Sequence, residues 1–374
     1  MLPGGGLEDQ PAPPGRPGPA RGLPGGLGRA GRRPAGAGAG RLLLGARGPV
    51  GGGGPAARDH RSRRVSGVVG AEWDGRGRGT TLAPVRSWAA GSALDRQPLH
   101  RQSPEWLARL WEQENARLLK VTETGEFYTC DSGRRLRLPR PFVAFDPQRH
   151  YLLGTVAEVP VFTVLSLPEG ETGSLRTVGH QLDEQERELA TVAVSLVNWH
   201  RQAAHCPVCG APTTVLHGGS SRRCTRCGEQ LFPRTDPAVI VAVVDPEDRL
   251  LLARQASWPE DRASILAGFV EAGESLEQAV HREILEEADV ELTDLRYWGS
   301  QPWPVPRSLM LGFTARSASS EVTVDGDELV TGRFWSREEV QQAVADGSLV
   351  LPMSSSIASR MIRAWLDGRL LGDG

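Results

Sequence analysis

Hydrophobic and polar residues follow two kinds of periodicity along the chain from about residue 93 onward. Leu107, Leu110 and Trp111 lie at helical spacing, and the sequence Ser-Pro-Glu at 103–105 is typical of a helix N-terminus. Short apolar runs bounded by Gly, Pro or Asp then predict strands, because such residues end extended segments. The predicted strands cover 118–121, 141–144, 151–156 and 159–165. With a long predicted helix over 184–200, residues 91–203 are expected to form a small α+β domain.

A different pattern begins at Pro237. Residues 238–244 form a nearly continuous β-branched run, typical of a strand covered on both faces, and 250–254 are its expected hairpin partner. Further strands are predicted over 295–298, 309–315 and 332–335, and helices over 276–288, 336–346 and 354–367. We interpret residues 235–374 as a separate domain, preceded by a short cysteine-rich module at 204–234.

Composition separates the first 90 residues from the rest of the chain. They hold 24 of the 45 Gly and 11 of the 28 Pro, and 14 Arg against 5 acidic residues, although the whole chain has a net charge of only −2. Such a segment buries too little apolar surface to offset the entropy of ordering, so residues 1–90 are predicted to be disordered. One Lys against 42 Arg indicates GC-rich coding. We therefore expect a true translation start downstream, at a non-ATG codon near Val65 or Val85.

Two Cys-x-x-Cys pairs are separated by fourteen residues, and Gly210 and Gly228 follow them directly. Each pair predicts a knuckle, and four thiolates closing a tetrahedron suit one structural Zn²⁺ with no open position for catalysis. The predicted ligands are Cys206, Cys209, Cys224 and Cys227. Two disulfides or four free thiols are the alternatives. This cysteine usage favours a reducing compartment over a secreted disulfide framework. No apolar run is long enough to span a bilayer, so we expect a cytoplasmic protein without a membrane partner.

The stretch 268–290 carries the strongest chemical pattern. Glu283, Glu286 and Glu287 lie at i, i+3 and i+4, so their carboxylates share one face of the predicted helix. Three carboxylates repel one another unless a cation lies among them, and hard oxygen ligands select Mg²⁺ or Mn²⁺. Arg282 is expected to hold the carboxylates in place. The residues expected on the buried side are Val280, Ile284 and Leu285.

The alternative to a metal site is an acidic helix face that is simply exposed to solvent. The spacing of the whole motif around the three glutamates argues against this alternative. Gly268 is followed after five residues by Glu274, and seven residues later by Arg-Glu-aliphatic-any-Glu-Glu from Arg282. A chance match over so many fixed positions is improbable. The chain thereby resembles the Nudix hydrolases, although the family usually has Gly where this chain has Asp289, a residue type that tolerates the left-handed conformation. The resemblance implies an α/β fold class, with a C-terminal α/β/α sandwich on a mixed sheet, and metal-dependent hydrolysis of a nucleoside diphosphate linked to another moiety.

An array of proline and tryptophan follows at 301–308, Gln-Pro-Trp-Pro-Val-Pro-Arg-Ser. Three prolines spaced by two predict a stiff, extended loop. The array is similar to that of the NADH pyrophosphatase subfamily of Nudix hydrolases, in which Phe usually stands at the position of Val305. A zinc ribbon before the Nudix domain and a helix ending in Trp-His-Arg, here 199–201, belong to the same architecture. The resemblance covers about residues 94–370.

The resemblance also implies roles for individual residues. The ligands of two or three Mg²⁺ or Mn²⁺ ions would be Ala267 through its carbonyl, Glu283, Glu286, Glu287 and Glu328. Asp327 competes with Glu328 for this role. Glu287 by preference, or Glu328, would take the proton of the attacking water, and Arg282 completes the catalytic group. The residues implied to contact the substrate are Phe232, Phe269, Gln301, Pro302, Trp303, Pro304, Val305, Pro306, Arg307, Ser308, Glu328 and Ala358.

The expected function is therefore hydrolysis of the pyrophosphate of NAD(H) to NMN(H) and AMP. Removal of NAD caps from RNA 5′ ends by the same chemistry is the alternative, and hydrolysis of another nucleoside diphosphate derivative such as ADP-ribose is a second one. A function outside the enzymes is a further alternative: a binding protein with a zinc ribbon and a degenerate Nudix domain. The intact Glu283, Glu286 and Glu287 argue against it. The family resemblance also implies a homodimer.

Overall fold

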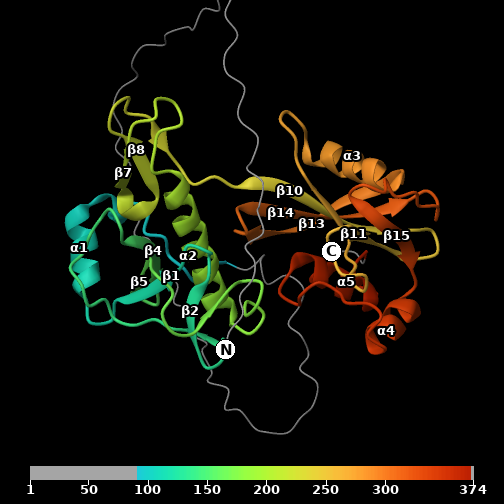
Figure 1. Cartoon of the computed structure of the whole chain (residues 1–374), viewed down its shortest axis with the longest axis horizontal. Helices are drawn as coiled ribbons and strands as arrows, with labels where there is room; N and C mark the ends of the chain where they lie inside the picture. The colour runs from blue at the N-terminus through green and yellow to red at the C-terminus, as the bar shows by residue number, and fades with distance from the viewer. Residues whose placement is uncertain (1–90, 372–374) are drawn as a thin grey trace, which may run out of the picture. The chain divides into compact units, whose positions relative to one another are not determined.

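The structure is a computed structural model, and it describes residues 91–371 (Figure 1). The segment predicted to be disordered, 1–90, and the expected downstream start lie outside these residues. The residues described form three sheets with helices between and beside them. No helix in this part of the chain is both long and apolar enough to cross a membrane.

The N-terminal domain is built on a six-stranded sheet of order β3-β2-β1-β5-β4, with β6 paired to β2. Its elements are α1 (Pro104–Glu112), β1 (Arg117–Val121), β2 (Phe127–Cys130), β3 (Arg135–Leu136), β4 (Tyr151–Val156), β5 (Val159–Leu165), β6 (Thr172–Gly173) and α2 (Glu184–Gln202), with a 3₁₀ turn at His100–Gln102. The predicted N-terminus of α1 is confirmed, because the Ser103 side chain accepts a hydrogen bond from the backbone N–H of Trp106. Helix α2 packs on the sheet through a core that includes Phe127, Leu189 and Ala193.

One predicted strand of this domain is wrong. Residues 141–144 have no regular structure, and Phe142 is 76% exposed. The prolines at 139 and 141 explain the difference, because each removes a backbone N–H that a sheet ladder needs. The segment instead passes over α1, where Trp111 Nε1 donates to the carbonyl of Val143 at 2.9 Å.

The cysteine-rich module follows as a three-stranded sheet of β7 (Thr213–Leu216), β8 (Ser221–Cys224) and β9 (Gln230–Leu231), with a 3₁₀ turn at His217–Gly219. Two buried arginines connect it to the N-terminal domain. Arg101 donates to the carbonyls of His217 at 2.9 Å, Leu152 at 2.6 Å and Gly218 at 3.2 Å. The second is Arg222, whose guanidinium donates to the Nδ1 of His200 at 2.9 Å and to Thr213 Oγ1 at 2.7 Å.

His200 takes one tautomer in this arrangement. Burial holds its pKa down at about 3, so the imidazole is neutral at physiological pH. Its Nδ1 accepts from Arg222, so its Nε2–H donates to the carbonyl of Gly219 at 2.9 Å. The ring also stacks on Tyr151, with centroids 3.7 Å apart. The end of α2, strand β4 and the module are thereby fixed to one another.

The C-terminal domain contains a mixed sheet of order β13-β14-β10-β11-β15, with β12 paired to β10. Its elements are β10 (Asp236–Val244), β11 (Leu250–Gln255), β12 (Leu266–Phe269), α3 (Leu276–Ala288), β13 (Leu292–Trp303), β14 (Ser308–Ser317), β15 (Leu329–Trp335), α4 (Arg337–Ala345) and α5 (Ile357–Leu366). Strand β10 pairs antiparallel with β11, as predicted, and parallel with β14.

Both faces of β10 are covered, which confirms the prediction from its β-branched run. Ile240, Ala242 and Val244 point into a core with α4 and α5. Val239, Val241 and Val243 point into a second core with α3. Figure 1 shows α3 on one side of the sheet and α4 and α5 on the other. The domain is therefore an α/β/α sandwich, as expected.

Part of the proline and tryptophan array forms a strand, where its sequence predicts a loop throughout. Gln301, Pro302 and Trp303 are the last residues of β13 and pair with Met310, Leu309 and Ser308 of β14. Only residues 304–307 form the turn between these strands. Pro302 is tolerated because β13 is an edge strand, where a missing N–H leaves no partner unsatisfied.

Candidate active site

Helix α3 begins and ends at positions set by its sequence. Ser275 and Gln278 form a capping box at its N-terminus. At the C-terminus Asp289 takes the left-handed conformation, with φ 52° and ψ 41°, and its N–H donates to the carbonyl of Leu285. The substitution of the usual Gly by Asp289 therefore preserves the helix end.

The residues of α3 predicted to be buried or to bind metal differ in exposure. Val280 and Ile284 are fully buried, as predicted, but Leu285 is 50% exposed and the prediction for it is wrong. The buried stripe of α3 continues instead to Glu287, which is only 5% exposed, whereas Glu286 is exposed. Leu285 lies about 100° around the helix from Ile284 and so falls outside this stripe.

Arg282 binds the acidic residues around it. Its Nε and Nη2 donate to the two carboxylate oxygens of Glu274 at 2.8 and 2.9 Å, and its Nη1 donates to Glu283 at 2.9 Å and Glu286 at 3.2 Å. Nη2 also donates to the carbonyl of Phe269 at 2.9 Å. The guanidinium thereby attaches the loop before α3 to the helix. Glu274 does not cap the helix, because Ser275 fills that position.

Gly268 lets the Glu283 carboxylate approach the backbone of β12. A Cβ atom at position 268 would lie 1.9 Å from Cδ of Glu283. The backbone φ of Gly268 is not left-handed, so close approach alone requires glycine here. The side chain of Glu283 is thus held next to Ala267, whose carbonyl is on the same strand.

We expect the substitution Gly268→Ala to lower turnover by about 100-fold, because Glu283 must move by more than an ångström and such a displacement has roughly that effect on catalysis. Steady-state kinetics with NADH, the substrate expected from the sequence, measures the loss. Gly299→Ala is the matched control, since a Cβ there meets nothing within 4 Å. Equal activity of the two variants would contradict a role for the Gly268–Glu283 approach.

Burial and neighbouring charges raise the pKa of Glu287 to about 8, with desolvation the largest cause and the charges of Glu328 and Glu283 next. Desolvation likewise raises the pKa of Glu283, whereas the guanidinium of Arg282 lowers the pKa of Glu274 to about 2. Among the described residues, no side chain donates a hydrogen bond to Glu287. A desolvated carboxylate among like charges is a group that a bound cation would stabilise, so this donor set fits a hard divalent metal.

A cavity of about 220 Å³ opens beside Glu287. Of the predicted site residues, its lining includes Ala267, Glu287, Gln301, Trp303 and Ala358. Gln301 is fixed at its edge, because its amide donates to the carbonyl of Ser355 at 2.9 Å and accepts from the N–H of Ile357 at 2.7 Å. A cavity beside the buried glutamate thus has a rigid polar wall.

A second cavity, of about 470 Å³, lies beside the β13–β14 turn. The predicted residues in its lining are Phe232, Pro302, Trp303, Pro304, Pro306, Arg307 and Ser308. Trp303 contributes to both cavities. Val305, Phe269 and Glu328 lie outside both linings, and the Phe232 and Phe269 side chains are 54% and 56% exposed. The backbone N–H groups of Glu328 and Leu329 are held by Asp325.

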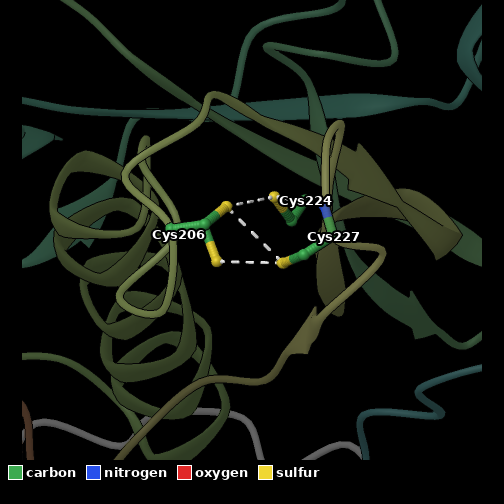
Figure 2. A group of neighbouring side chains, drawn as sticks. Cys206, Cys224 and Cys227 are labelled. Atoms are coloured by element: carbon green, nitrogen blue, oxygen red, sulfur yellow. Dashed lines mark hydrogen bonds between the residues drawn. The ribbon is translucent and has the colours of Figure 1, made fainter.

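The four thiols of the cysteine-rich module converge on one point (Figure 2). Their sulfurs lie within 4.8 Å of one another, and within residues 91–371 this is the one group of three or more potential ligands that meets so closely. No disulfide joins them. The backbone N–H groups of Cys227 and Arg226 donate to the Cys224 sulfur and lower its pKa to about 6. Gly210 and Gly228 have positive φ, as the predicted knuckles require. Thiolates in this arrangement fit a structural zinc ion.

Comparison with known families gives a match for the C-terminal domain and another for the cysteine-rich module. A family model described as NUDIX domain matches residues 234–352, and one described as NADH pyrophosphatase zinc ribbon domain matches residues 201–232. The C-terminal domain is a Nudix domain. The cysteine-rich module in front of it is a zinc ribbon of the NADH pyrophosphatase type.

Several curated proteins resemble the ribbon and the Nudix domain in sequence. The Mycobacterium tuberculosis (strain H37Rv) protein named NAD-capped RNA hydrolase NudC is 45% identical over 204 residues, which are 52% of this chain and 65% of that protein. The human protein named NAD-capped RNA hydrolase NUDT12 is 36% identical over 198 residues, 50% of this chain and 43% of that protein. The chain thus spans less than two thirds of these relatives. A crystal structure of a NUDIX hydrolase from Nitrosomonas europaea matches at 20% identity and a TM-score of 0.37, covering 45% of this chain and 93% of that one.

Three residues that line the cavity of the Nudix domain were not found from the sequence. Arg176, from the segment between β6 and α2, has its guanidinium 5.9 Å from the ring centroid of Trp303. Trp258 and Arg262 come from the loop between β11 and β12. No local pattern marks any of them, because each reaches the cavity through tertiary packing alone.

The raised pKa of Glu287 gives the metal-free protein a distinct pH dependence. The folded state keeps the proton up to about pH 8, whereas the unfolded chain releases it near its ordinary value of 4.5. We therefore expect the free energy of unfolding to fall as the pH rises from about 4.5 to about 8. Bound Mg²⁺ would cancel this fall and would release up to one proton at pH 7.

Thermal unfolding of chelator-treated protein at about pH 5.5 and about pH 8, with and without Mg²⁺, measures this effect. Calorimetric titration of Mg²⁺ in two buffers of different ionisation enthalpy counts the protons released. Glu287→Gln is the control, since it has no proton to release at that position. An identical pH dependence in the variant and the parent protein would show that Glu287 is not the group concerned.

Proposed function

We propose that the chain is a metal-dependent NAD(H) diphosphatase that hydrolyses the pyrophosphate to NMN(H) and AMP. The observation that carries the proposal is the cavity in which the buried Glu287 faces Gln301 and Trp303, residues of the array that resembles the NADH pyrophosphatase subfamily. The zinc ribbon directly before the Nudix domain supports the same assignment.

In this proposal the catalytic cations are two or three Mg²⁺ or Mn²⁺ ions, and the ribbon holds one Zn²⁺. The ligands of the catalytic ions would be the Ala267 carbonyl, Glu283, Glu286, Glu287 and Glu328. When bound, such ions neutralise the pyrophosphate and lower the pKa of a water molecule. Arg282 keeps Glu283 and Glu286 oriented through its Nη1.

Glu287 is the preferred acceptor of the proton from the attacking water. It lines the cavity and is nine-tenths buried, so its carboxylate competes with little bulk water. Glu328 is the second choice, because it is exposed, although its charge acts on Glu287. The proton leaves the water as its oxygen bonds to one phosphorus, and the bond from that phosphorus to the bridging oxygen breaks.

The dinucleotide would be held by three groups of residues. All residues of the array at 301–308 except Val305 line one of the two cavities, Trp303 lines both, and Ala358 lines the first. The exposed rings of Phe232 and Phe269 offer flat surfaces for a base. We extend the proposal to a cytoplasmic homodimer, which the reduced cysteines and the family resemblance support.

Removal of NAD caps from RNA is the second candidate function. It is favoured by the names of the mycobacterial and human relatives, which share 45% and 36% identity with this chain over their matched parts. The chemistry at the pyrophosphate would be the same. The two functions differ in whether the pocket leaves the adenosine 3′-oxygen open to solvent.

A product assay tests the proposal. Purified protein is supplied with Mg²⁺ or Mn²⁺ and incubated with NADH, NAD⁺, ADP-ribose or NAD-capped RNA, and the products are separated by chromatography. We expect AMP and NMN(H) from the dinucleotides, or a 5′-monophosphate RNA from the capped transcript. Failure to cleave any nicotinamide dinucleotide, capped or free, would overturn the proposal.

A further inference from the structure

Trp258 lies in the loop between β11 and β12 and lines the same cavity as Glu287 and Ala267. We propose that Trp258 is a substrate-binding residue whose indole stacks on the base of one nucleotide half of the dinucleotide. The inference rests on the proposed function and adds to it a specificity-determining residue in a cavity that Gln301 and Trp303 of the proline and tryptophan array also line.

The loop that carries Trp258 is fixed on both sides. Ala253 and Ser264 exchange backbone hydrogen bonds of 2.9 and 3.0 Å across its base. The N–H of Val350 donates to the carbonyl of Asp261 at 2.7 Å, and a guanidinium N–H of Arg254 donates to the carbonyl of Trp258 at 3.3 Å. The indole is therefore presented by a preorganised wall, which lowers the entropy that a ligand loses on stacking.

The ring of Trp258 is only partly buried. The Arg262 guanidinium lies over it, with Cζ 5.0 Å from the ring centroid, and both side chains line the cavity. A cation on an aromatic face holds the ring in place. The part of the ring that lines the cavity is then available to a planar ligand. A base is such a ligand, and the guanidinium beside it suits the negative charge of a nucleotide.

A second pair of a cation and an indole lines the same cavity. Trp303 lines it with Arg176, whose Cζ is 5.9 Å from that ring centroid. The lining thus combines two indoles and two cations with one buried carboxylate. Its volume of about 220 Å³ is below the roughly 300–1,000 Å³ of complete ligand sites, so in this proposal it receives one half of the dinucleotide beside the proposed metal ligand Glu287.

The test uses Trp258→Leu, which keeps apolar bulk and removes the flat ring, and Trp258→Phe, which restores a smaller one. The matched control is Trp335→Leu. Trp335 also lies under a guanidinium, with Arg333 Cζ 3.5 Å from its ring, but it is on β15 outside the lining of the cavity. For Trp258→Leu we expect KM for NADH to rise about 10-fold or more with kcat little changed, and Trp258→Phe to recover most of the loss.

Competition by the two products, AMP and NMN, identifies which half stacks on Trp258, since that product alone should lose affinity in Trp258→Leu. Parental KM and parental affinity for both products in Trp258→Leu would overturn the inference. So would a KM increase that Trp335→Leu shares, because that would reflect a general loss of packing. If the parent protein cleaves no dinucleotide but binds AMP or NMN through Trp258, the proposed function fails and this inference stands.

Discussion

Glu287→Gln is expected to lose at least about 1,000-fold in turnover of NADH, because it removes a residue that we propose both as a ligand of the catalytic cations and as the proton acceptor. The fold should be unaffected. Gln has nearly the shape of the protonated carboxyl group, which is the form that the pKa of about 8 favours at neutral pH without metal. The melting temperature of the metal-free variant should therefore equal or exceed that of the parent at about pH 8.

Initial rates with NADH and Mg²⁺, together with zinc content and thermal unfolding, measure this result. Glu277→Gln is the matched control, because Glu277 is an exposed glutamate in the first turn of the same helix and contacts none of the clustered carboxylates. It should keep full activity. Retained turnover in Glu287→Gln would remove Glu287 from the role of base and transfer it to Glu328.

Loss of the zinc ligands is expected to have the largest effect on stability. Binding of zinc to a four-thiolate site contributes about 10–16 kcal/mol at pH 7, and the ribbon's own core consists of little more than Cys206, Ala211 and Cys224. We expect Cys206→Ala to lose the metal and to unfold residues around 205–231. Phe232, which directly follows β9, would then lose its fixed position in the lining of the second cavity.

Zinc content by mass spectrometry and hydrogen exchange across the ribbon measure this loss. Cys130→Ala provides the comparison, since Cys130 is an exposed thiol outside the cluster and should be replaceable without effect. Full protection of the ribbon amides in Cys206→Ala without bound zinc would show that the metal is not what holds this module together.

Sequence patterns predicted the elements whose determinants are local. The β-branched run of β10, the N-terminal sequence of α1 and the knuckle glycines each act over a few residues, and the structure has them as expected. Predictions of strands and of buried residues failed where apolar character alone was misleading, because backbone chemistry or the position around the helix decided the outcome. Prolines prevent a strand at 141–144, and Leu285 lies just outside the buried stripe of its helix.

The rest of the site depends on contacts between distant segments. Arg176 meets Trp303 across more than a hundred residues of sequence, and the loop that carries Trp258 is held in part by Val350, which is distant in sequence. Neither contact leaves a periodic signal. The array at 301–308 was also predicted incompletely for this reason. Its prolines predict a loop, whereas residues 301–303 form the end of the edge strand β13 through their pairing with β14.

Arg101 and Arg222 make it difficult to remove the zinc ribbon from this protein or to transfer it to another one. Both guanidiniums are buried, and their hydrogen bonds go to carbonyls, a hydroxyl and an imidazole. Excising the ribbon would take from Arg101 the carbonyls of His217 and Gly218 and would separate Arg222 from His200. The ribbon and the N-terminal domain would therefore have to be moved together in any truncated or chimeric protein.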